Sequence, residues 1–240
     1  MDNIILLSDD VRLYERLGEV LDPTLFHIDM VPAGTNAGRI AAEKVHSLFI
    51  FDAGFSATGC FVQLAALRKA TASPIIVCFP HNDSASYITA LEMGADDCFS
   101  KPANSREMAA RIRSLLRRVG APDQPMFSAD TALITVGDVE VDPFSRQAQI
   151  AGSVMELTSI EFSVLEILLR HAGNVVTREL LFREVFGREM SPFDRSLDVH
   201  ISNLRKKLRC HSPVEYIKTI RSVGYQYVIT RGGKTARMTD

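Results

Sequence analysis

Acidic side chains and one lysine follow three short apolar segments in the first half of the sequence. Two aspartates follow the first segment, one aspartate follows the second, and the lysine follows the third: Asp9, Asp10, Asp52 and Lys101. Such segments are typical of buried parallel strands, whose carboxyl ends meet at one edge of a sheet. We therefore expect the four side chains to lie in one crevice.

Carboxylates and a lysine in one crevice favour metal and phosphoryl chemistry. Two carboxylates about 4 Å apart repel by roughly 4 kcal/mol at an effective dielectric of about 20, so a cation is expected among them. Mg²⁺ prefers carboxylate and phosphoryl oxygens as ligands. Asp52 is placed to act as a carboxylate nucleophile, and Lys101 is placed to neutralise a transferred phosphoryl group. The sequence predicts a Mg²⁺ site of Asp9, Asp10 and Asp52.

Residues 1–118 alternate apolar runs with helical patterns five times. Right-handed crossovers then predict a doubly wound parallel sheet with its ligand site beyond the carboxyl ends of the strands. The expected strands are residues 4–8, 26–31, 47–52, 75–79 and 97–100, and the expected helices are 10–22, 36–45, 60–70, 84–93 and 104–118.

A second domain is predicted from residue 127 to residue 231, after a linker at 119–126 and before a polar tail at 232–240. Short strands open this domain. Thr158 and Glu161 have the spacing of a capping box for the next helix, and Thr177 caps another helix. A third helix is expected at 196–209, followed by two strands.

The third helix of this domain has two different faces. Leu197, Ile201, Leu204 and Leu208 form an apolar face, whereas Val199, Ser202, Asn203 and Lys206 form the opposite one. Residues 195–234 hold nine Lys or Arg against two Asp or Glu, within a chain of net charge −2. A basic segment with such a helix indicates a helix-turn-helix with a β-wing that binds double-stranded DNA.

The N-terminal pattern resembles the receiver domain of two-component response regulators. The matching motifs are Asp9-Asp10, Asp52, Gly94-Ala95-Asp96-Asp97 and Lys101-Pro102. The resemblance implies a flavodoxin-like (βα)5 fold, in which Asp9 and Asp10 hold Mg²⁺, Asp52 accepts phosphate from a sensor histidine kinase, and Lys101 contacts that phosphate.

This receiver departs from its family at the positions that respond to the phosphate. Phe79 replaces the usual Thr or Ser, Cys98 replaces the switch aromatic residue, and Ser56 replaces a proline. Phe79 cannot donate a hydrogen bond. Three interpretations remain open: phosphorylation that acts by another route, phosphorylation of little consequence, and a regulator independent of phosphate. A redox switch between Cys78 and Cys98 is a further alternative to two buried thiols.

The last helix of the receiver carries charges that resemble the dimerisation face of one response-regulator subfamily. The residues concerned are Asp96, Asp97, Glu107, Arg111 and Arg113. By resemblance, Asp97 pairs with Arg111 and Asp96 with Arg113 across the two-fold axis of a homodimer. The alternative is a solvated charged surface, and exposed ion pairs contribute only about 0–1 kcal/mol each.

The C-terminal motifs resemble the winged-helix effector domain of the OmpR/PhoB subfamily. They include Leu157-Thr158, Asp194-Arg195, Leu204-Arg205-Lys206-Lys207-Leu208 and Arg221-Ser222-Val223-Gly224-Tyr225. Val199, Ser202 and Asn203 are the expected base readers, since Asn can read adenine and Val can pack on a thymine methyl group. The expected phosphate contacts are Arg195, His200, Arg205 and Lys206, and the resemblance implies that Arg221 enters the minor groove. It also implies tandem DNA repeats as targets and contact with RNA polymerase through the loop at 187–193.

Composition excludes several other classes of protein. No apolar stretch approaches the length of a membrane span, and no secretory signal precedes the first strand, so a cytoplasmic protein is expected. Four cysteines without CxxC spacing disfavour a zinc site or a disulfide framework. An aspartyl-phosphate phosphotransfer enzyme is disfavoured because Asp52-Ala53-Gly54 lacks the second aspartate that aspartyl phosphatases use.

Overall fold

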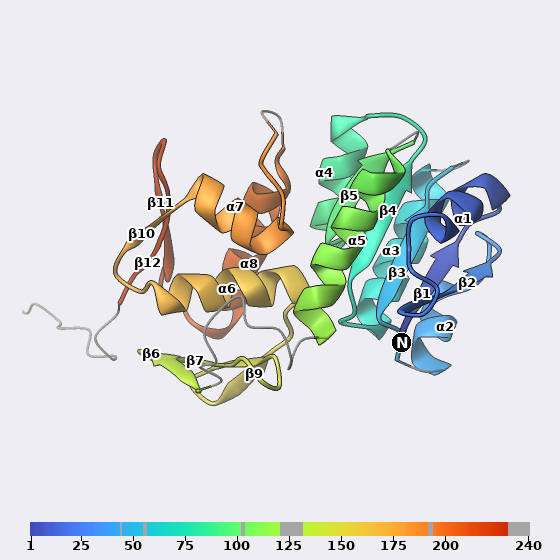
Figure 1. Cartoon of the computed structure of the whole chain (residues 1–240). Coiled ribbons are helices and arrows are strands. Elements are labelled where there is room, and N and C mark those ends of the chain that lie inside the picture. The colour runs from blue at the N-terminus through green and yellow to red at the C-terminus, as the bar shows by residue number, and fades with distance from the viewer. Residues whose placement is uncertain (44, 55–56, 102–103, 121–131, 192–193, 230–240) are drawn as a thin grey trace, which may run out of the picture.

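The computed structural model of the chain describes residues 1–43, 45–54, 57–101, 104–120, 132–191 and 194–229. Two groups of elements lie side by side, one built from each half of the chain (Figure 1). We call them the N-terminal domain and the C-terminal domain. Most of the predicted linker, the predicted tail, Ser56 and Pro102 lie outside the described residues.

The N-terminal domain alternates strands and helices along the whole of its length. The central strands β3 and β4 are buried throughout, whereas the edge strand β2 is only partly buried. The carboxylates of Asp10 and Asp83 cap the helices α1 and α4. The elements are β1 (Asp2–Leu7), α1 (Val11–Gly18), β2 (Phe26–Val31), α2 (Ala37–Glu43), β3 (Leu48–Asp52), α3 (Ala57–Ala70), β4 (Ile75–Phe79), α4 (Ser84–Glu92), β5 (Asp97–Ser100) and α5 (Ser105–Gly120).

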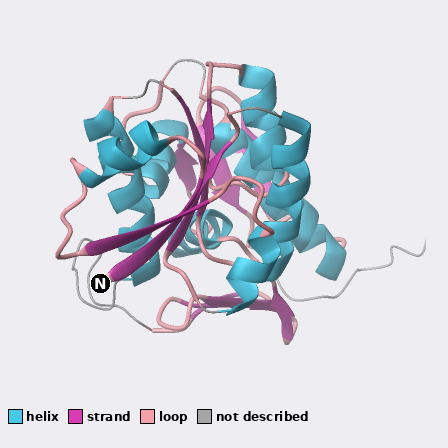
Figure 2. Cartoon of the chain, turned by 90° about the vertical axis from the view of Figure 1, so that its right-hand side faces the viewer, coloured by secondary structure: helices cyan, strands magenta, loops and turns pink. Residues whose placement is uncertain are grey.

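The five strands form one parallel sheet in the order β2-β1-β3-β4-β5, with helices on both of its faces (Figure 2). The order reverses beside β1, so a crevice forms at the carboxyl ends of β1 and β3. In the register between these strands, Leu7 lies opposite Phe51. The residue after β1 is therefore level with the last residue of β3.

The C-terminal domain contains three helices between two antiparallel sheets. The sheets have the orders β6-β7-β8-β9 and β10-β12-β11. The predicted capping box between Thr158 and Glu161 is present, and Thr177 caps the next helix as predicted. The elements are β6 (Ile134–Val136), β7 (Val139–Asp142), β8 (Gln147–Ile150), β9 (Ser153–Met155), α6 (Ser159–Arg170), β10 (Val175–Thr177), α7 (Arg178–Phe186), α8 (Ser196–His211), β11 (Ile217–Ile220) and β12 (Gly224–Tyr227).

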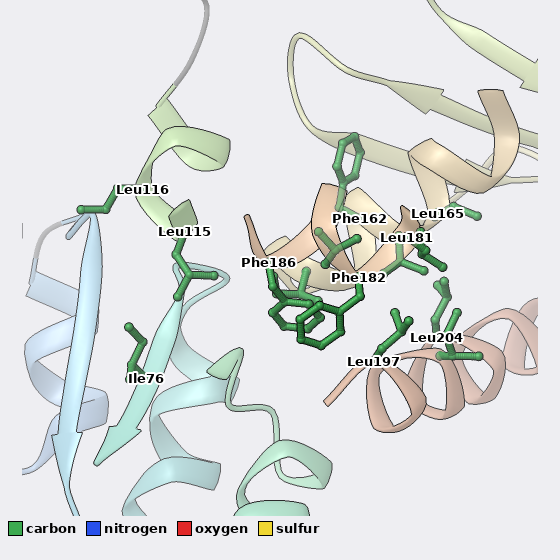
Figure 3. Packing of buried hydrophobic residues seen from close by; sticks show 14 of the residues in the cluster. Ile76, Leu115, Leu116, Phe162, Leu165, Leu181, Phe182, Phe186, Leu197 and Leu204 are labelled. Atoms are coloured by element: carbon green, nitrogen blue, oxygen red, sulfur yellow. The ribbon is translucent and has the colours of Figure 1, made fainter. Parts of the chain in front are cut away.

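Buried apolar side chains of the two domains belong to one continuous cluster. Leu115 and Ile76 represent the N-terminal domain in this cluster, and Phe186 and Phe182 represent the C-terminal domain (Figure 3). The predicted apolar face of α8 is buried, since Leu197 and Leu204 have no exposed surface. No helix among the described residues is long and apolar enough to span a membrane.

The strand β10 is an element that the sequence analysis did not single out. It is three residues long and pairs with β12, so Val176 lies opposite Tyr225. Gly224 sits at the end of this ladder, where a Cβ atom would lie 2.0 Å from the carbonyl oxygen of Val176. Only glycine fits this close approach of two strands.

Candidate functional site

Asp52 ends β3 and is buried at the carboxyl edge of the parallel sheet. Its Oδ2 atom accepts a hydrogen bond from Ser8 Oγ at 2.6 Å and one from Lys101 Nζ at 2.7 Å. The Lys101 ammonium also donates to Asp10 Oδ2 at 2.8 Å. The hydrogen bond from Lys101 lowers the pKa of Asp10 below its ordinary value, and burial opposes this. Lys101 thus joins two of the predicted acids in one pocket.

The structure does not bring the third predicted acid, Asp9, into this pocket. Asp9 is exposed, and its Oδ1 accepts a hydrogen bond from the backbone N–H of Ala33 at 3.2 Å. The reason is the strand register, because Ser8 is the residue level with Asp52 and Asp9 comes one position later. The expectation that Asp9, Asp10 and Asp52 converge is therefore not met in this arrangement.

The donor set does not fit a divalent cation well. No three His, Cys, Asp or Glu side chains among the described residues are grouped so that they could hold a metal ion. Ser8 contributes a neutral hydroxyl beside Asp52, and the ammonium of Lys101 already lies between Asp10 and Asp52. Asp52 Oδ1 is buried and accepts no hydrogen bond from any described residue. This buried oxygen therefore keeps an unused capacity to accept a hydrogen bond or bind a ligand.

Aromatic rings occupy the region next to the pocket. Phe79 is buried at the end of β4, and its ring centroid lies 5.2 Å from that of Tyr87 on α4 and 6.4 Å from that of Phe61 on α3. Cys98 is also buried, close to the carbonyl oxygen of Tyr87. Phe79 and Cys98 thus both contact α4 at Tyr87.

The register of β4 and β5 excludes a disulfide between Cys78 and Cys98 in this fold. Cys98 lies opposite Val77, while Cys78 lies opposite Phe99. Side chains alternate between the faces of a strand, so the two cysteines point to opposite faces of the sheet. Burial raises the pKa of the Cys78 thiol to about 12. Buried, unreactive thiols are therefore the interpretation that the structure supports.

The expected DNA-reading face of α8 packs against the N-terminal domain (Figure 1). Val199 is buried within an apolar cluster whose other members belong to the N-terminal domain. Asn203 Nδ2 donates to the carbonyl oxygen of Leu91, near the end of α4, at 3.2 Å. His200 is buried, and its Nε2 lies 3.0 Å from the carbonyl oxygen of Asp96. Ser202 remains exposed.

Asp96 connects the two domains through both its side chain and its backbone. Its carboxylate is fully buried, and Oδ2 accepts from Arg68 Nη2 at 2.7 Å and from the N–H of Ile75 at 2.9 Å. Its Oδ1 accepts from the N–H of Ile160, at the start of α6, at 3.4 Å. On α5, Ser114 Oγ donates to the carbonyl oxygen of Phe186 at 2.7 Å. Together with the contact between His200 and the Asp96 carbonyl oxygen, these bonds join α5 and the residue before β5 to α6, α7 and α8.

The residues expected at a dimer interface have partners within the same chain. Arg111 binds Asp97 at 2.8 Å and Glu107 at 2.7 Å. Arg188 of the C-terminal domain lies 3.6 Å from Asp97. The Asp96 carboxylate faces the protein interior, and Arg113 Nη1 donates to the carbonyl oxygen of Val20 at 3.4 Å. In this arrangement the Asp97–Arg111 pair is intramolecular and an Asp96–Arg113 pair does not form.

Several expected phosphate contacts remain on the surface. Lys206 and Arg221 are exposed, and Arg195 is exposed with Asp198 at 3.8 Å. Arg205 instead holds the wing, because its guanidinium donates to the carbonyl oxygen of Ile217 at 3.0 and 2.8 Å.

Beside Arg205 lies a shallow pocket of about 350 Å³ between α8 and β11. Arg209 and Lys218 also line it, together with Glu215. These cations lie off the face of α8 that meets the N-terminal domain.

Asp198, on α8, binds one arginine of the C-terminal domain and lies near another. Arg178 donates to both of its carboxylate oxygens, and the hydroxyl of Tyr225 also donates to it. Burial alone would raise the pKa of Asp198, but the hydrogen bonds from Arg178 and Tyr225 hold it below the ordinary value. Tyr225 is buried in the core of the C-terminal domain.

Comparisons with known proteins agree with this two-domain arrangement. The family model described as "Transcriptional regulatory protein, C terminal" matches residues 152–227. The transcriptional regulatory protein CpxR of Klebsiella pneumoniae is 35% identical over 230 residues, covering 95% of this chain and 99% of that protein. The alkaline phosphatase synthesis transcriptional regulatory protein PhoP of Bacillus subtilis is 38% identical over 229 residues, covering 93% and 95%.

A solved structure of a RitR mutant has the same fold. Its TM-score is 0.72, its sequence is 24% identical, and the match covers 95% of this chain and 99% of that one. A five-stranded parallel receiver-like sheet followed by a winged helix defines a DNA-binding transcriptional regulator. The chain belongs to the OmpR/PhoB family of two-component response regulators. The segment His200–Arg205 of the expected DNA-reading helix also resembles the corresponding segment of CpxR, in agreement with the full-length match.

Two contributors to the site were missed by reasoning from the sequence. Ser8 was passed over because two adjacent aspartates follow it, although alignment of the ends of β1 and β3 would have placed Ser8 next to Asp52. Leu91 contributes a backbone carbonyl, which the residue type does not signal.

Proposed function

We propose that the N-terminal domain keeps this transcriptional regulator in a DNA-silent arrangement by covering the reading face of α8. Release of α8 then permits recognition of a promoter by Val199, Ser202 and Asn203. The observation that carries the proposal is the hydrogen bond from Asn203 to Leu91, together with the burial of Val199 and His200.

A helix that reads DNA must enter the major groove with its side chains against the base edges. The groove is about 12 Å wide and admits a helix, but not a helix with α4 lying on its reading face. Because Asn203 donates to Leu91, its amide cannot at the same time donate to a base along the same direction. Masking and specific binding are therefore mutually exclusive states of α8.

Dimerisation through the charged face of the N-terminal domain follows the same logic. Asp97 and Arg111 bind each other within the chain, and Arg188 of the C-terminal domain lies close to Asp97. Departure of the C-terminal domain exposes this face, and Asp97, Glu107 and Arg111 then become available for a homodimer on tandem DNA repeats. The opened protein is also the form expected to meet RNA polymerase.

Phosphorylation of Asp52 by a sensor histidine kinase is the first candidate for the input. An oxygen of Asp52 attacks the phosphorus of a phosphohistidine, a P–O bond forms, the P–N bond breaks, and the imidazole leaves with the electron pair. Lys101 lies 2.7 Å from Asp52 Oδ2 and is placed to neutralise the added charge.

A second candidate is release without phosphate, and Phe79 favours it. Its ring packs on Tyr87 where a hydrogen-bond donor to the phosphate would be needed. The aromatic contact ties β4 to α4, which is the helix that covers α8. A ligand or a change in protein concentration would then supply the input.

The masking proposal is tested by opening the domain interface from the receiver side. Ser114 is buried on α5, away from the DNA-binding residues, and Ser114→Lys places a long charged side chain against Phe186. The matched control Ser114→Ala removes only one hydrogen bond, which is worth about 1 kcal/mol. The probe is a duplex selected from a random-sequence pool with the Ser114→Lys protein.

Fluorescence anisotropy measures binding of that duplex, and small-angle X-ray scattering measures the radius of gyration. Ser114→Lys is expected to bind at least about tenfold more tightly than the wild type and to be more extended, with Ser114→Ala in between. Equal affinities, with a more extended Ser114→Lys protein, would refute masking. Intact mass after treatment with an acyl phosphate, for wild type beside Asp52→Asn, separates the two candidate inputs.

A further inference from the structure

The charge balance of the Asp52 pocket differs from that of a pocket built for Mg²⁺. We propose that Lys101 is the resident cation of this pocket and that Ser8, by its neutrality, keeps a divalent cation from binding. The inference concerns this pocket alone and does not depend on the masking of α8.

Ser8 occupies the position on β1 that faces Asp52. It is buried, its Oγ donates to Asp52 Oδ2 at 2.6 Å, and the same Oγ accepts from the N–H of Asp10 at 3.0 Å. Both bonds fix the hydroxyl in place, with its proton directed at Asp52 Oδ2. Ser8 therefore supplies no negative charge where a third carboxylate would have to lie.

The other two aspartates already have hydrogen-bond partners of their own. Asp9 Oδ1 binds the backbone N–H of Ala33 and the residue is exposed. Asp10 Oδ1 caps α1 through the N–H groups of Arg12 and Leu13 at 3.1 and 3.4 Å. Recruiting Asp9 to Asp52 would break its bond to Ala33, whereas Asp10 Oδ2, the oxygen that does not cap the helix, is already bound by Lys101.

Lys101 fills the remaining space between the carboxylates. Its Nζ lies 2.8 Å from Asp10 and 2.7 Å from Asp52, so the three charged groups sum to one net negative charge. A divalent cation at this place would lie within a few ångströms of the ammonium and be repelled by it. Mg²⁺ also gives up its water reluctantly and prefers a site with several oxygen ligands in octahedral geometry.

One consequence is that the pocket is stable without a metal ion. The only oxygen left without a hydrogen-bond partner among the described residues of the pocket is Asp52 Oδ1, and it is buried. Input through Asp52 by Mg²⁺-assisted phosphoryl transfer would then be slow. A single change, Ser8→Asp, would supply the missing carboxylate.

The experiment titrates MgCl₂ into the full-length protein by isothermal calorimetry and by thermal unfolding, at constant ionic strength. We expect the wild type to show no saturable heat and no rise of its unfolding midpoint as MgCl₂ is raised to about 10 mM. That concentration is about ten times the ligand needed to half-fill a site with a Kd of about 1 mM. Ser8→Asp is expected to gain Mg²⁺ affinity by about tenfold or more, because an added carboxylate is a preferred ligand. Ser8→Asn is the control, because its side chain has the size of Asp without the charge. It should not gain affinity for Mg²⁺.

A second variant keeps the inference testable if Ser8→Asp does not fold. Lys101→Met removes the resident cation and leaves Asp10 and Asp52 unneutralised, so it too should gain affinity for Mg²⁺. Saturable binding to the wild type below about 1 mM that is lost in Asp52→Asn would overturn the inference. The absence of any gain in both Ser8→Asp and Lys101→Met would overturn it as well.

Discussion

Two buried aspartates of the receiver, Asp52 and Asp96, lie in opposite environments. Asp52 stands at the open end of the sheet, where Lys101 and Ser8 bind one of its oxygens and the other oxygen has no partner among the described residues. Asp96 is fully buried, and Arg68, Ile75 and Ile160 bind its two oxygens.

The difference separates a site that awaits a ligand from one that is already complete. A buried carboxylate whose oxygens all accept hydrogen bonds has a structural role. Removing one of its partners leaves a buried charge without compensation. A carboxylate with one free oxygen retains the capacity for chemistry. Asp52, on the input side of this receiver, therefore keeps one carboxylate oxygen without a partner among the described residues. Asp96, on the side that faces the DNA-binding domain, has partners for both of its oxygens.

The largest effect is expected at the closed site. Arg68→Met removes the cation that binds Asp96, and breaking a buried pair in this way costs about 3–5 kcal/mol. Chemical denaturation followed by circular dichroism measures the free energy of unfolding.

Lys101→Met is the matched comparison at the open site. Asp10, one of its two partners, is more than one third exposed, so a smaller loss of about 1 kcal/mol is expected. If the two variants lose equal stability, the contrast between the two aspartates is wrong.

The next effect is expected at the masked face of α8. In the Ser114→Lys background, Asn203→Ala should weaken binding to the selected duplex by about 1–3 kcal/mol and relax its sequence preference. Fluorescence anisotropy with selected and random duplexes checks this. Equal weakening on both duplexes would show that Asn203 does not read bases.

A smaller effect is expected as the pH falls. Arg178 and Tyr225 hold the pKa of Asp198 below its ordinary value although burial opposes them, so its stabilisation is complete above the ordinary value of 3.8. This stabilisation is lost as the pH falls through the lower pKa of the folded protein. The unfolding midpoint measured between about pH 6 and pH 2 should fall less steeply at the acid end for Asp198→Asn than for the wild type. Parallel curves would contradict the assignment.

The smallest effect is expected at an exposed cation. Lys206→Ala should weaken binding to all duplexes alike and reduce the salt dependence of log K by about one unit of slope. Anisotropy titrations at several salt concentrations measure the slope, and Glu215→Ala on the same domain serves as a control that should not reduce it. A change in sequence preference instead would move Lys206 to the base-reading group.

Local patterns predicted the elements of this fold well. The apolar runs of the parallel strands, the capping box at Thr158 and the buried face of α8 all depend on residues close in sequence. These signals are read directly from periodicity and from the hydrogen-bonding capacity of side chains.

Tertiary register and domain contacts explain what the sequence could not predict. Ser8 rather than Asp9 lies beside Asp52 because β1 and β3 pair with Leu7 opposite Phe51, and this offset is a property of the pair of strands. The face of α8 that contains Val199 and Asn203 suits a DNA groove and a protein surface equally well. Its pattern therefore indicates a binding surface without indicating which partner covers it.

The double use of Asn203 ties promoter choice to basal expression. A substitution at this position that changes the preferred base also removes or strengthens its bond to Leu91, and so changes the fraction of unmasked molecules. Substitutions that accumulate toward a new target sequence would then also change how much the regulator binds DNA without an input signal. Compensation would have to come from α4, so the two helices are expected to change together during evolution.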